Sequence, residues 1–352
     1  MRQLTISNTA PPSCRVSRGP SHGLARDSPR ELSGTEESLR EIASVSGTDP
    51  HVSVVIPCYN GRATLPDTLG ALRKQHPPFA FEVIVVDSSD DGTDVLVAQE
   101  FPEVRLVHRD EKTPPGAARN LGVELAKASL LAFTDADCVP PADWLERLVE
   151  AHAADPCAAL GGAVRNGRRG NPVSVAECLI EFSEYLPSAP AGHAGFLPTC
   201  NALFTREAFE RYGPFHPDLY ASEDRLLGWR MEQAGERIRF EPSIAIDHLF
   251  RTHFRTFLKH QRALGAGAAI VREHYPLPDR WLVTSPLRWA IGLARLLRLQ
   301  RRLLGQSFAD FLRFNVLSPI TFSGVLSWGW GFATGRRSGE RQRLRLDVED
   351  DA

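Results

Sequence analysis

The sequence predicts an α/β fold in which a mostly parallel central sheet carries helices on both faces. Apolar, β-branched runs such as 52–60 and 81–93 alternate with segments of helical spacing, a pattern typical of parallel strands joined by crossover helices. The strand-like runs end in polar or acidic residues, and ligands of such sheets bind beyond the carboxyl ends of the strands. With 352 residues, the chain is long enough for one large α/β domain with additions.

The alternation is regular as far as about residue 155. The expected strands are 52–60, 81–93 with an acidic turn at its end, 104–108 and 130–137, and the helices between them are 64–75, 95–101 and 116–129.

After residue 155 the alternation weakens. We expect a strand at 159–167, then a strand, a turn and a helix within 198–215, and a further strand within 237–250. A helix is expected over 222–235, with Ser222 as its N-cap and Gly235 as its end.

Composition and charge exclude several classes of protein. The formal net charge is −2, so no general affinity for nucleic acid is expected. The six cysteines include no CxxC pair, which favours reduced thiols in a cytoplasmic protein over a zinc site or a disulfide framework. The N-terminus lacks the apolar stretch of a secretory signal. Residues 1–50 predict a disordered leader with room for one short helix in 31–45.

Two aspartates end the apolar run LLAFTDAD. Asp135 and Asp137 are one residue apart, and without a partner they would repel each other and lose hydration. A divalent cation such as Mg²⁺ or Mn²⁺ removes this cost, because it binds carboxylate oxygen and keeps positions open for phosphate. The alternative is a solvated loop in which an aspartate only caps the following helix.

Acidic residues also lie at the end of another expected strand and at the start of an expected helix. Asp87 follows the apolar run VIVV, where it could accept hydrogen bonds from a nucleobase or a ribose, while its neighbours in SSDDG cap a helix. Glu223 and Asp224 begin the helix over 222–235. The helix dipole alone favours carboxylates there, and the alternative is that one of them faces a cleft as a general base.

Four stretches resemble a known family when they are taken together and in this order: VSVVIPCYNG, VIVVDSSDDGT, PGAARNLGVELAKASLLAFTDADCVPPADWL and NALFTREAFERYGPFHPDLYASEDRLLGWRM. They are similar to family 2 glycosyltransferases, which are inverting enzymes of the GT-A fold, over residues 52–265. The resemblance implies a GT-A catalytic domain over 51–270. Its nucleotide-sugar-binding half would cover 51–155 and its acceptor half 156–270.

The resemblance implies a donor pocket built from four residues that match family motifs. Pro57 and Tyr59 would line the nucleotide pocket, Asp87 would bind the base, and Arg119 would lie near the nucleotide. The donor would be a nucleoside-diphosphate sugar.

The resemblance also implies roles for the remaining acids. Asp135 and Asp137 match the two acids that hold the ribose and the metal-bound diphosphate, and both are candidate metal ligands, with Asp137 expected to bind the metal directly. His248 resembles a further metal ligand in some relatives, and the alternative is an ordinary histidine at a strand end. Asp224 matches the catalytic base, while Glu223 would orient its neighbours or touch the acceptor.

The implied activity is transfer of a sugar to an acceptor hydroxyl with inversion, with Mn²⁺ or Mg²⁺ stabilising the departing diphosphate. Two alternatives remain open. A nucleotidyltransferase that makes sugar nucleotides would need a Gly- and Lys/Arg-rich triphosphate loop, of which PCYNGRA supplies little. A non-catalytic protein that binds nucleotide sugars would not need the intact acids.

Residues 271–337 predict a membrane-associating helical region. On a helix over 280–304, four arginines fall on one side and Trp and Leu residues on the other: Arg288, Arg295, Arg298 and Arg302. Such a helix suits the surface of an anionic membrane, and the alternative is a helix packed on the catalytic domain with its arginines in water.

Residues 315–335 carry no charged side chain. They could span a membrane, enter it partly, or pack in the core, and the tail over 338–352 is expected to be disordered. We therefore expect a protein at the cytoplasmic face of a membrane that glycosylates a sugar or a lipid-linked acceptor.

Overall fold

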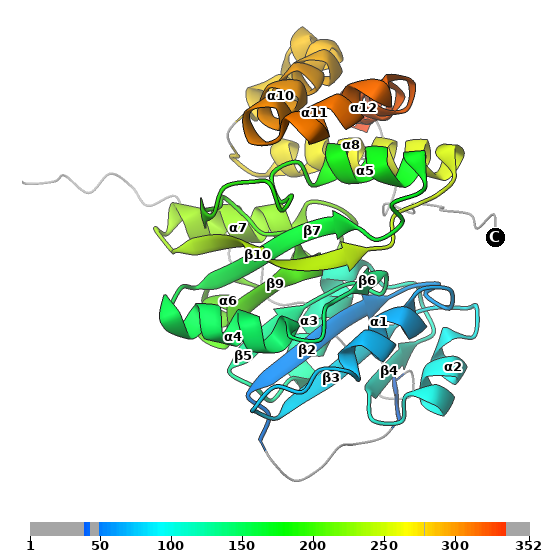
Figure 1. Cartoon of the computed structure of the whole chain (residues 1–352), viewed down its shortest axis with the longest axis vertical. Helices are drawn as coiled ribbons and strands as arrows, with labels where there is room; N and C mark the ends of the chain where they lie inside the picture. The colour runs from blue at the N-terminus through cyan, green and yellow to red at the C-terminus, as the bar shows by residue number, and fades with distance from the viewer. Residues whose placement is uncertain (1–38, 43–48, 278, 336–352) are drawn as a thin grey trace, which may run out of the picture. The chain divides into compact units, whose positions relative to one another are not determined.

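The computed structural model describes residues 39–42, 49–277 and 279–335. The strands are β1 (Leu39–Ile42), β2 (Val52–Cys58), β3 (Phe81–Asp87), β4 (Arg105–Arg109), β5 (Leu130–Phe133), β6 (Cys138–Val139), β7 (Ala159–Asn166), β8 (Gly192–His193), β9 (Ala202–Thr205) and β10 (Ile238–His248). They form one sheet in the order β1-β4-β3-β2-β5-β9-β7-β10-β6, with β8 beside β10 (Figure 1).

The predicted α/β fold with a mostly parallel sheet is confirmed. Strands β4, β3, β2 and β5 pair in parallel, as do β7 and β10. Antiparallel pairing is confined to the contacts of β1, β6, β8 and β9. Because β9 is antiparallel to both β5 and β7, the two parallel groups point in the same direction, and their carboxyl ends lie along one edge.

Helices cover both faces of the sheet, as predicted. They are α1 (Leu65–Leu72), α2 (Thr93–Glu100), α3 (Pro115–Leu125), α4 (Trp144–Ala154), α5 (Pro172–Glu181), α6 (Arg206–Tyr212), α7 (Glu223–Gln233) and α8 (Phe254–His274). Val54 and Ile56 of β2 belong to the core shared with α1, α2 and α4, whereas Val55 faces α3, α6 and α7. This alternation follows from the two-residue period of a strand.

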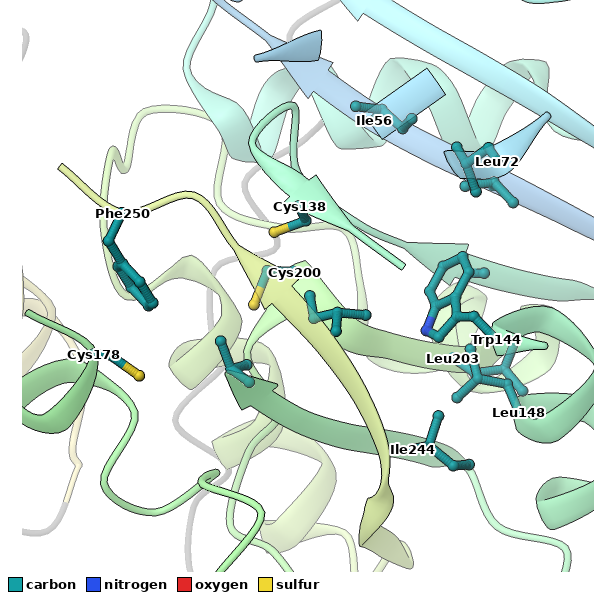
Figure 2. Close-up of a cluster of buried hydrophobic side chains, with 14 of the residues drawn as sticks. Ile56, Leu72, Cys138, Trp144, Leu148, Cys178, Cys200, Leu203, Ile244 and Phe250 are labelled. Carbon is teal, nitrogen blue, oxygen red and sulfur yellow. The ribbon is translucent and has the colours of Figure 1, made fainter. Parts of the chain in front are cut away.

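The centre of the core contains one buried polar network. Trp144 is fully buried, and its Nε1 donates a hydrogen bond to Oδ1 of Asn201 at 2.9 Å. The Asn201 amide donates to the carbonyls of Ala163 at 2.9 Å and Ile244 at 3.0 Å, where the register of β10 against β7 shifts. Figure 2 shows Trp144 and Ile244 in this cluster, together with the free thiols of Cys138 and Cys200. The network satisfies the backbone groups that the irregular strand leaves unpaired.

The C-terminal segment forms α9 (Trp281–Thr284), a short 3₁₀ helix (Pro286–Ala290), α10 (Ile291–Gln306), α11 (Phe308–Val316) and α12 (Ser318–Thr334). Helix α12 packs along α8 and also contacts α5 and α10 (Figure 1). Glycines make this contact close. A Cβ on Gly331 would lie 2.0 Å from the carbonyl oxygen of Arg262, and one on Gly265 would lie 2.0 Å from that of Trp328. No helix in the described part of the chain has the length and apolarity needed to cross a membrane.

Two predicted helices differ in the structure. Within 31–45, residues 39–42 form β1 instead of a helix, because the edge of β4 offers unpaired backbone groups to an extended segment. The rest of 31–45 and the tail over 338–352 lie outside the described residues. The single helix expected over 280–304 is interrupted where Pro286 begins a new turn, since proline lacks the N–H that a continuous helix requires.

Candidate active site

A cavity of about 740 Å³ lies where β2 and β5 end and α7 begins. This is the edge of the sheet at which ligands were expected to bind. Its walls include residues 57–61, 135–137 and 220–225, and parts of α5, α8, α10 and α12. All of the predicted site residues except Asp87 line it: Pro57, Tyr59, Arg119, Asp135, Asp137, Glu223, Asp224 and His248.

Arg119 joins two of the acids. From α3, its Nη2 donates to Oδ1 of Asp135 at 2.6 Å, and its Nη1 donates to Oε1 of Glu223 at 2.7 Å. Burial disfavours the charge of the guanidinium, but Asp135 and Glu223 outweigh this and raise the pKa of Arg119. Arg119 was predicted to lie near the nucleotide. In the structure it also connects Asp135, which follows β5, to Glu223 at the start of α7.

Asp224 lies in the first turn of α7 and lines the cavity. Its Oδ1 accepts a hydrogen bond from the backbone N–H of Arg225 at 2.6 Å. Burial and the neighbouring charge of Glu223 raise the pKa of Asp224 to about 7. The preceding residue, Ser222, has a φ of 71° and makes no capping hydrogen bond through its side chain, although it occupies the predicted N-cap position. A carboxylate with this pKa can take up a proton near neutral pH.

Asp137 and His248 face each other. The Nε2 atom of His248 lies 3.6 Å from Oδ1 of Asp137. They meet because β6, which follows Asp137 directly, pairs antiparallel with the end of β10. The imidazole stacks on Phe250 with ring centroids 4.1 Å apart, which holds its orientation.

The donor atoms of this pair suit a divalent cation. A carboxylate oxygen and an imidazole nitrogen suit Mn²⁺ better than Mg²⁺, which prefers oxygen ligands alone. The Nδ1 atom of His248 is buried and has no hydrogen-bond partner among the described residues. No hydrogen bond at Nδ1 therefore fixes the tautomer of the ring. The nearby thiol of Cys138 is a poor ligand, because burial raises its pKa well above the usual value.

Asp87 does not reach the cavity. Its side chain is fully buried, and its carboxylate accepts a hydrogen bond from the hydroxyl of Ser89 and lies 2.8 Å from Nδ1 of His108 on β4. The hydroxyl of Ser89 in turn accepts a bond from the backbone N–H of Asn60, which lines the cavity, at 2.7 Å. Direct binding of a base by Asp87 stays a prediction, and the contacts in the structure connect it to the cavity through Ser89.

The same cavity holds a second group of charged residues that was not predicted from the sequence. His260 of α8 lies 3.3 Å from Glu181 of α5. Burial disfavours the charge of Glu181, but His260 and Arg251 outweigh it and lower the pKa of Glu181 to about 2. Arginines of α8 and α10 line the cavity as well. Local sequence gave no signal for this group, because helical periodicity does not show which face of a helix meets a cavity.

Comparison with known proteins agrees with this fold. The model of a family described as "Glycosyl transferase family 2" matches residues 53–213. A pre-mycofactocin glycosyltransferase of Mycobacterium tuberculosis is 29% identical over 302 residues, which cover 80% of this chain but only 62% of that protein. Glycosyltransferase AglE of Haloferax volcanii is 31% identical over 228 residues, which cover 63% of this chain and 74% of that protein.

A solved structure shares the fold. The mannosyltransferase PcManGT from Pyrobaculum calidifontis, in complex with GDP-Man and Mn²⁺, superimposes with a TM-score of 0.55 at 20% identity. The match covers 83% of this chain and 89% of that one. The fold is the GT-A fold that the sequence motifs implied.

Proposed function

The chain belongs to glycosyl transferase family 2, and on this premise we propose that it transfers a sugar from a nucleoside-diphosphate sugar to an acceptor hydroxyl with inversion. The observation that carries the proposal is the meeting of two kinds of group in one cavity. One is the metal-compatible pair of Asp137 and His248, and the other is Asp224, a carboxylate with a pKa near neutrality. Groups with such perturbed pKa values in a cavity are typical of functional sites.

The donor would occupy the part of the cavity between Tyr59 and Asp137. A related fold binds GDP-Man and Mn²⁺, and the donor atoms of Asp137 and His248 fit such an ion. When bound, the ion would stabilise the negative charge that develops on the departing diphosphate. Tyr59 and Lys112 line the nucleotide side, where the Lys112 ammonium lies 4.0 Å from the centre of the Tyr59 ring.

The residues of the chain itself would position and deprotonate the acceptor. Asp224 accepts the proton of the acceptor hydroxyl while that oxygen attacks the anomeric carbon from the side opposite the diphosphate. A single displacement of this kind inverts the anomeric centre. Arg119 holds Asp135 and Glu223 in place and offsets part of their negative charge, while the charge of Glu223 still helps to raise the pKa of Asp224.

The acceptor would be a glycan or a lipid-linked sugar at the cytoplasmic face of a membrane. This part of the proposal is supported by the C-terminal helices, since α10 and α12 form walls of the cavity that holds Asp224.

A donor panel with an Asp224→Asn variant tests the proposal. The enzyme is incubated with UDP-, GDP- and dTDP-sugars and Mn²⁺, and free nucleoside diphosphate is measured. We expect Asp224→Asn to lower turnover by about 10²–10⁴-fold while nucleotide affinity by calorimetry is unchanged. The control is Asp218→Asn, an exposed acid outside the cavity wall. Near wild-type turnover in Asp224→Asn, or no turnover of any donor by the wild type, would contradict the proposal.

A further inference from the structure

Helix α10 presents arginines to the cavity, packs Leu299 and Leu303 into the core, and leaves other leucines exposed to solvent. Arg295, Arg298 and Arg302 line the cavity, whereas Leu293 and Leu297 are 58% and 59% exposed. The structure therefore places these three arginines at the cavity, with Arg298 also exposed, and the expected contact of the helix with a membrane stays a prediction.

Four arginines from three helices form a cluster in this part of the cavity: Arg225 of α7, Arg272 of α8, and Arg295 and Arg298 of α10. Burial lowers the pKa of Arg295 to about 10, with Arg225 and Arg298 contributing as like charges. Burial also lowers the pKa of Arg272 to about 10, again with contributions from Arg225 and Arg298. The like charges of Arg225 and Arg298 thus act on both Arg272 and Arg295, and all four side chains line the same cavity.

Glu181 and Glu184 favour the charge of Arg295, and Asp279 favours that of Arg272, but none of these acids forms a direct ion pair with the cluster in the described residues. Among the described residues, none of the four makes an ion pair, whereas their neighbour Arg302 lies 2.7 Å from Glu184. The Nη2 atom of Arg295 donates to the carbonyl of Ile180 at 3.1 Å, and its guanidinium carbon lies 4.2 Å from the Trp328 ring centre. Its Nη1 atom is buried and has no hydrogen-bond partner in the described part of the chain. A buried cationic group without a partner is costly, so the Nη1 atom of Arg295, in a cavity lined by three further arginines, favours an anionic ligand.

The position of the cluster connects it with the acceptor. Arg225 directly follows Asp224, the proposed base. A base is needed only when the attacking group is a hydroxyl, because a phosphate oxygen is already ionised at neutral pH. The anionic group would thus be a second part of the acceptor, beside the hydroxyl. The acids with the largest effect on the pKa of Arg295 are Glu181 and Glu184. Neither is among the residues proposed to bind the donor.

The opposite side of α10 continues into a large exposed apolar surface. Of the large apolar side chains exposed within the described residues, all but Val95 and Phe254 lie between residues 281 and 330. On α10 and α11 they are Leu293, Leu297, Leu304, Phe308, Leu312 and Val316. We call these six residues the apolar face. An apolar helical surface of this kind suits the boundary of a bilayer.

We propose that the cluster of Arg225, Arg272, Arg295 and Arg298 binds the phosphate groups of a lipid-phosphate-linked acceptor, while the apolar face rests in the membrane that holds the lipid chain. The inference rests on the proposed function, because the acceptor hydroxyl is placed at Asp224. Charge complementarity inside the cavity and the apolar face on the same helix both point to one amphiphilic ligand.

Vesicle sedimentation tests the proposal without requiring turnover. The full chain is mixed with phosphatidylcholine vesicles that contain or lack farnesyl diphosphate as the lipid phosphate. Arg295→Gln and Arg298→Gln test the cluster. Arg301→Gln is the matched control, since Arg301 is exposed on the same helix and does not line the cavity. The double variant Leu293→Ser/Leu297→Ser tests the apolar face. Because Arg298 is exposed, its replacement is compatible with folding even if that of Arg295 is not.

We expect farnesyl diphosphate to strengthen vesicle binding of the wild type and of Arg301→Gln. Each cluster variant should lose about tenfold or more of that gain, as is typical when a charge-assisted bond to phosphate is removed. The serine variant should bind both kinds of vesicle more weakly. Cluster variants that keep the full gain would overturn the proposal. So would a loss of nucleoside-diphosphate affinity without a loss of vesicle binding, which would assign the arginines to the donor. Vesicle binding that is unaffected by the serine substitutions would indicate a soluble anionic acceptor instead.

The two proposals fail in different ways. If the donor panel shows no turnover but the cluster variants lose vesicle binding, the anion site stands and the glycosyl-transfer assignment falls. If turnover depends on Asp224 but the lipid phosphate has no effect, the enzyme stands and the acceptor assignment falls.

Discussion

Replacing Arg119 with methionine removes the connection between Asp135 and Glu223 while keeping most of the side-chain volume. The side chains of Arg119 and Glu223 are only 4% and 7% exposed, so this half of the bridge is buried. Removing one partner of a buried ion pair typically costs about 3–5 kcal/mol, because the other charge is left without compensation. The side chain of Asp135 is 27% exposed, so its half is screened by water and adds at most about 1 kcal/mol. We therefore expect Arg119→Met to lower the free energy of unfolding by about 4 kcal/mol.

Urea denaturation followed by tryptophan fluorescence measures this loss, and an unchanged slope would show that the unfolded surface is the same. Arg211→Met is the control, because Arg211 and Glu207 form a surface pair that is 56% and 79% exposed and should contribute less than about 1 kcal/mol. The double variant Arg119→Met/Glu223→Gln should recover part of the loss, since it removes the buried charge as well. A change below about 1 kcal/mol in Arg119→Met would refute the reasoning that this buried bridge holds the site together.

Three further predictions concern the acids of the cavity. Because the pKa of Asp224 is raised to about 7, kcat/KM should fall about tenfold per pH unit below that value, and a profile that stays flat to pH 5 would argue against Asp224 as the base. A raised carboxyl pKa means that ionisation of Asp224 costs stability as pH rises from about 4 to 7, so Asp224→Asn should gain stability relative to the wild type over that interval in denaturant titrations. Asp137→Ala should remove the part of UDP or GDP affinity that depends on Mn²⁺, as measured by calorimetry with and without the ion, whereas the exposed Asp90→Ala should retain it. Equal Mn²⁺-dependent affinity in Asp137→Ala and the wild type would exclude Asp137 as a ligand.

Local sequence was sufficient to predict features that involve only a strand or helix and the residues next to it in the chain. The apolar run 130–133 followed by Asp135 and Asp137 predicted a strand that delivers acids to the sheet edge, and both acids line the cavity. Asp91 accepts a hydrogen bond from the backbone N–H of Thr93 at 3.0 Å, so one residue of the SSDDG turn has the capping role that was considered. Such features depend on a few consecutive residues, and their chemistry can be inferred from residue type and spacing.

Features that depend on distant segments could not be inferred in this way. The imidazole of His108 contacts the carboxylate of Asp87 because β4 pairs with β3. Nothing near Asp87 in the sequence indicates that neighbour. Residues 39–42 form a strand only because β4 supplies a partner. The periodicity of α10 separated its arginines from its leucines correctly, but it could not show that the arginines face a cavity.

The anomeric configuration of the transferred sugar tests the central claim most directly. Slow hydrolysis of UDP-α-D-glucose or GDP-α-D-mannose by concentrated enzyme with Mn²⁺, followed by ¹H NMR before the released sugar equilibrates, shows which anomer forms first. A single displacement with Asp224 as the base predicts the β-anomer. Initial release of the α-anomer would contradict the account, because a single displacement from the face opposite the diphosphate cannot retain the anomeric configuration.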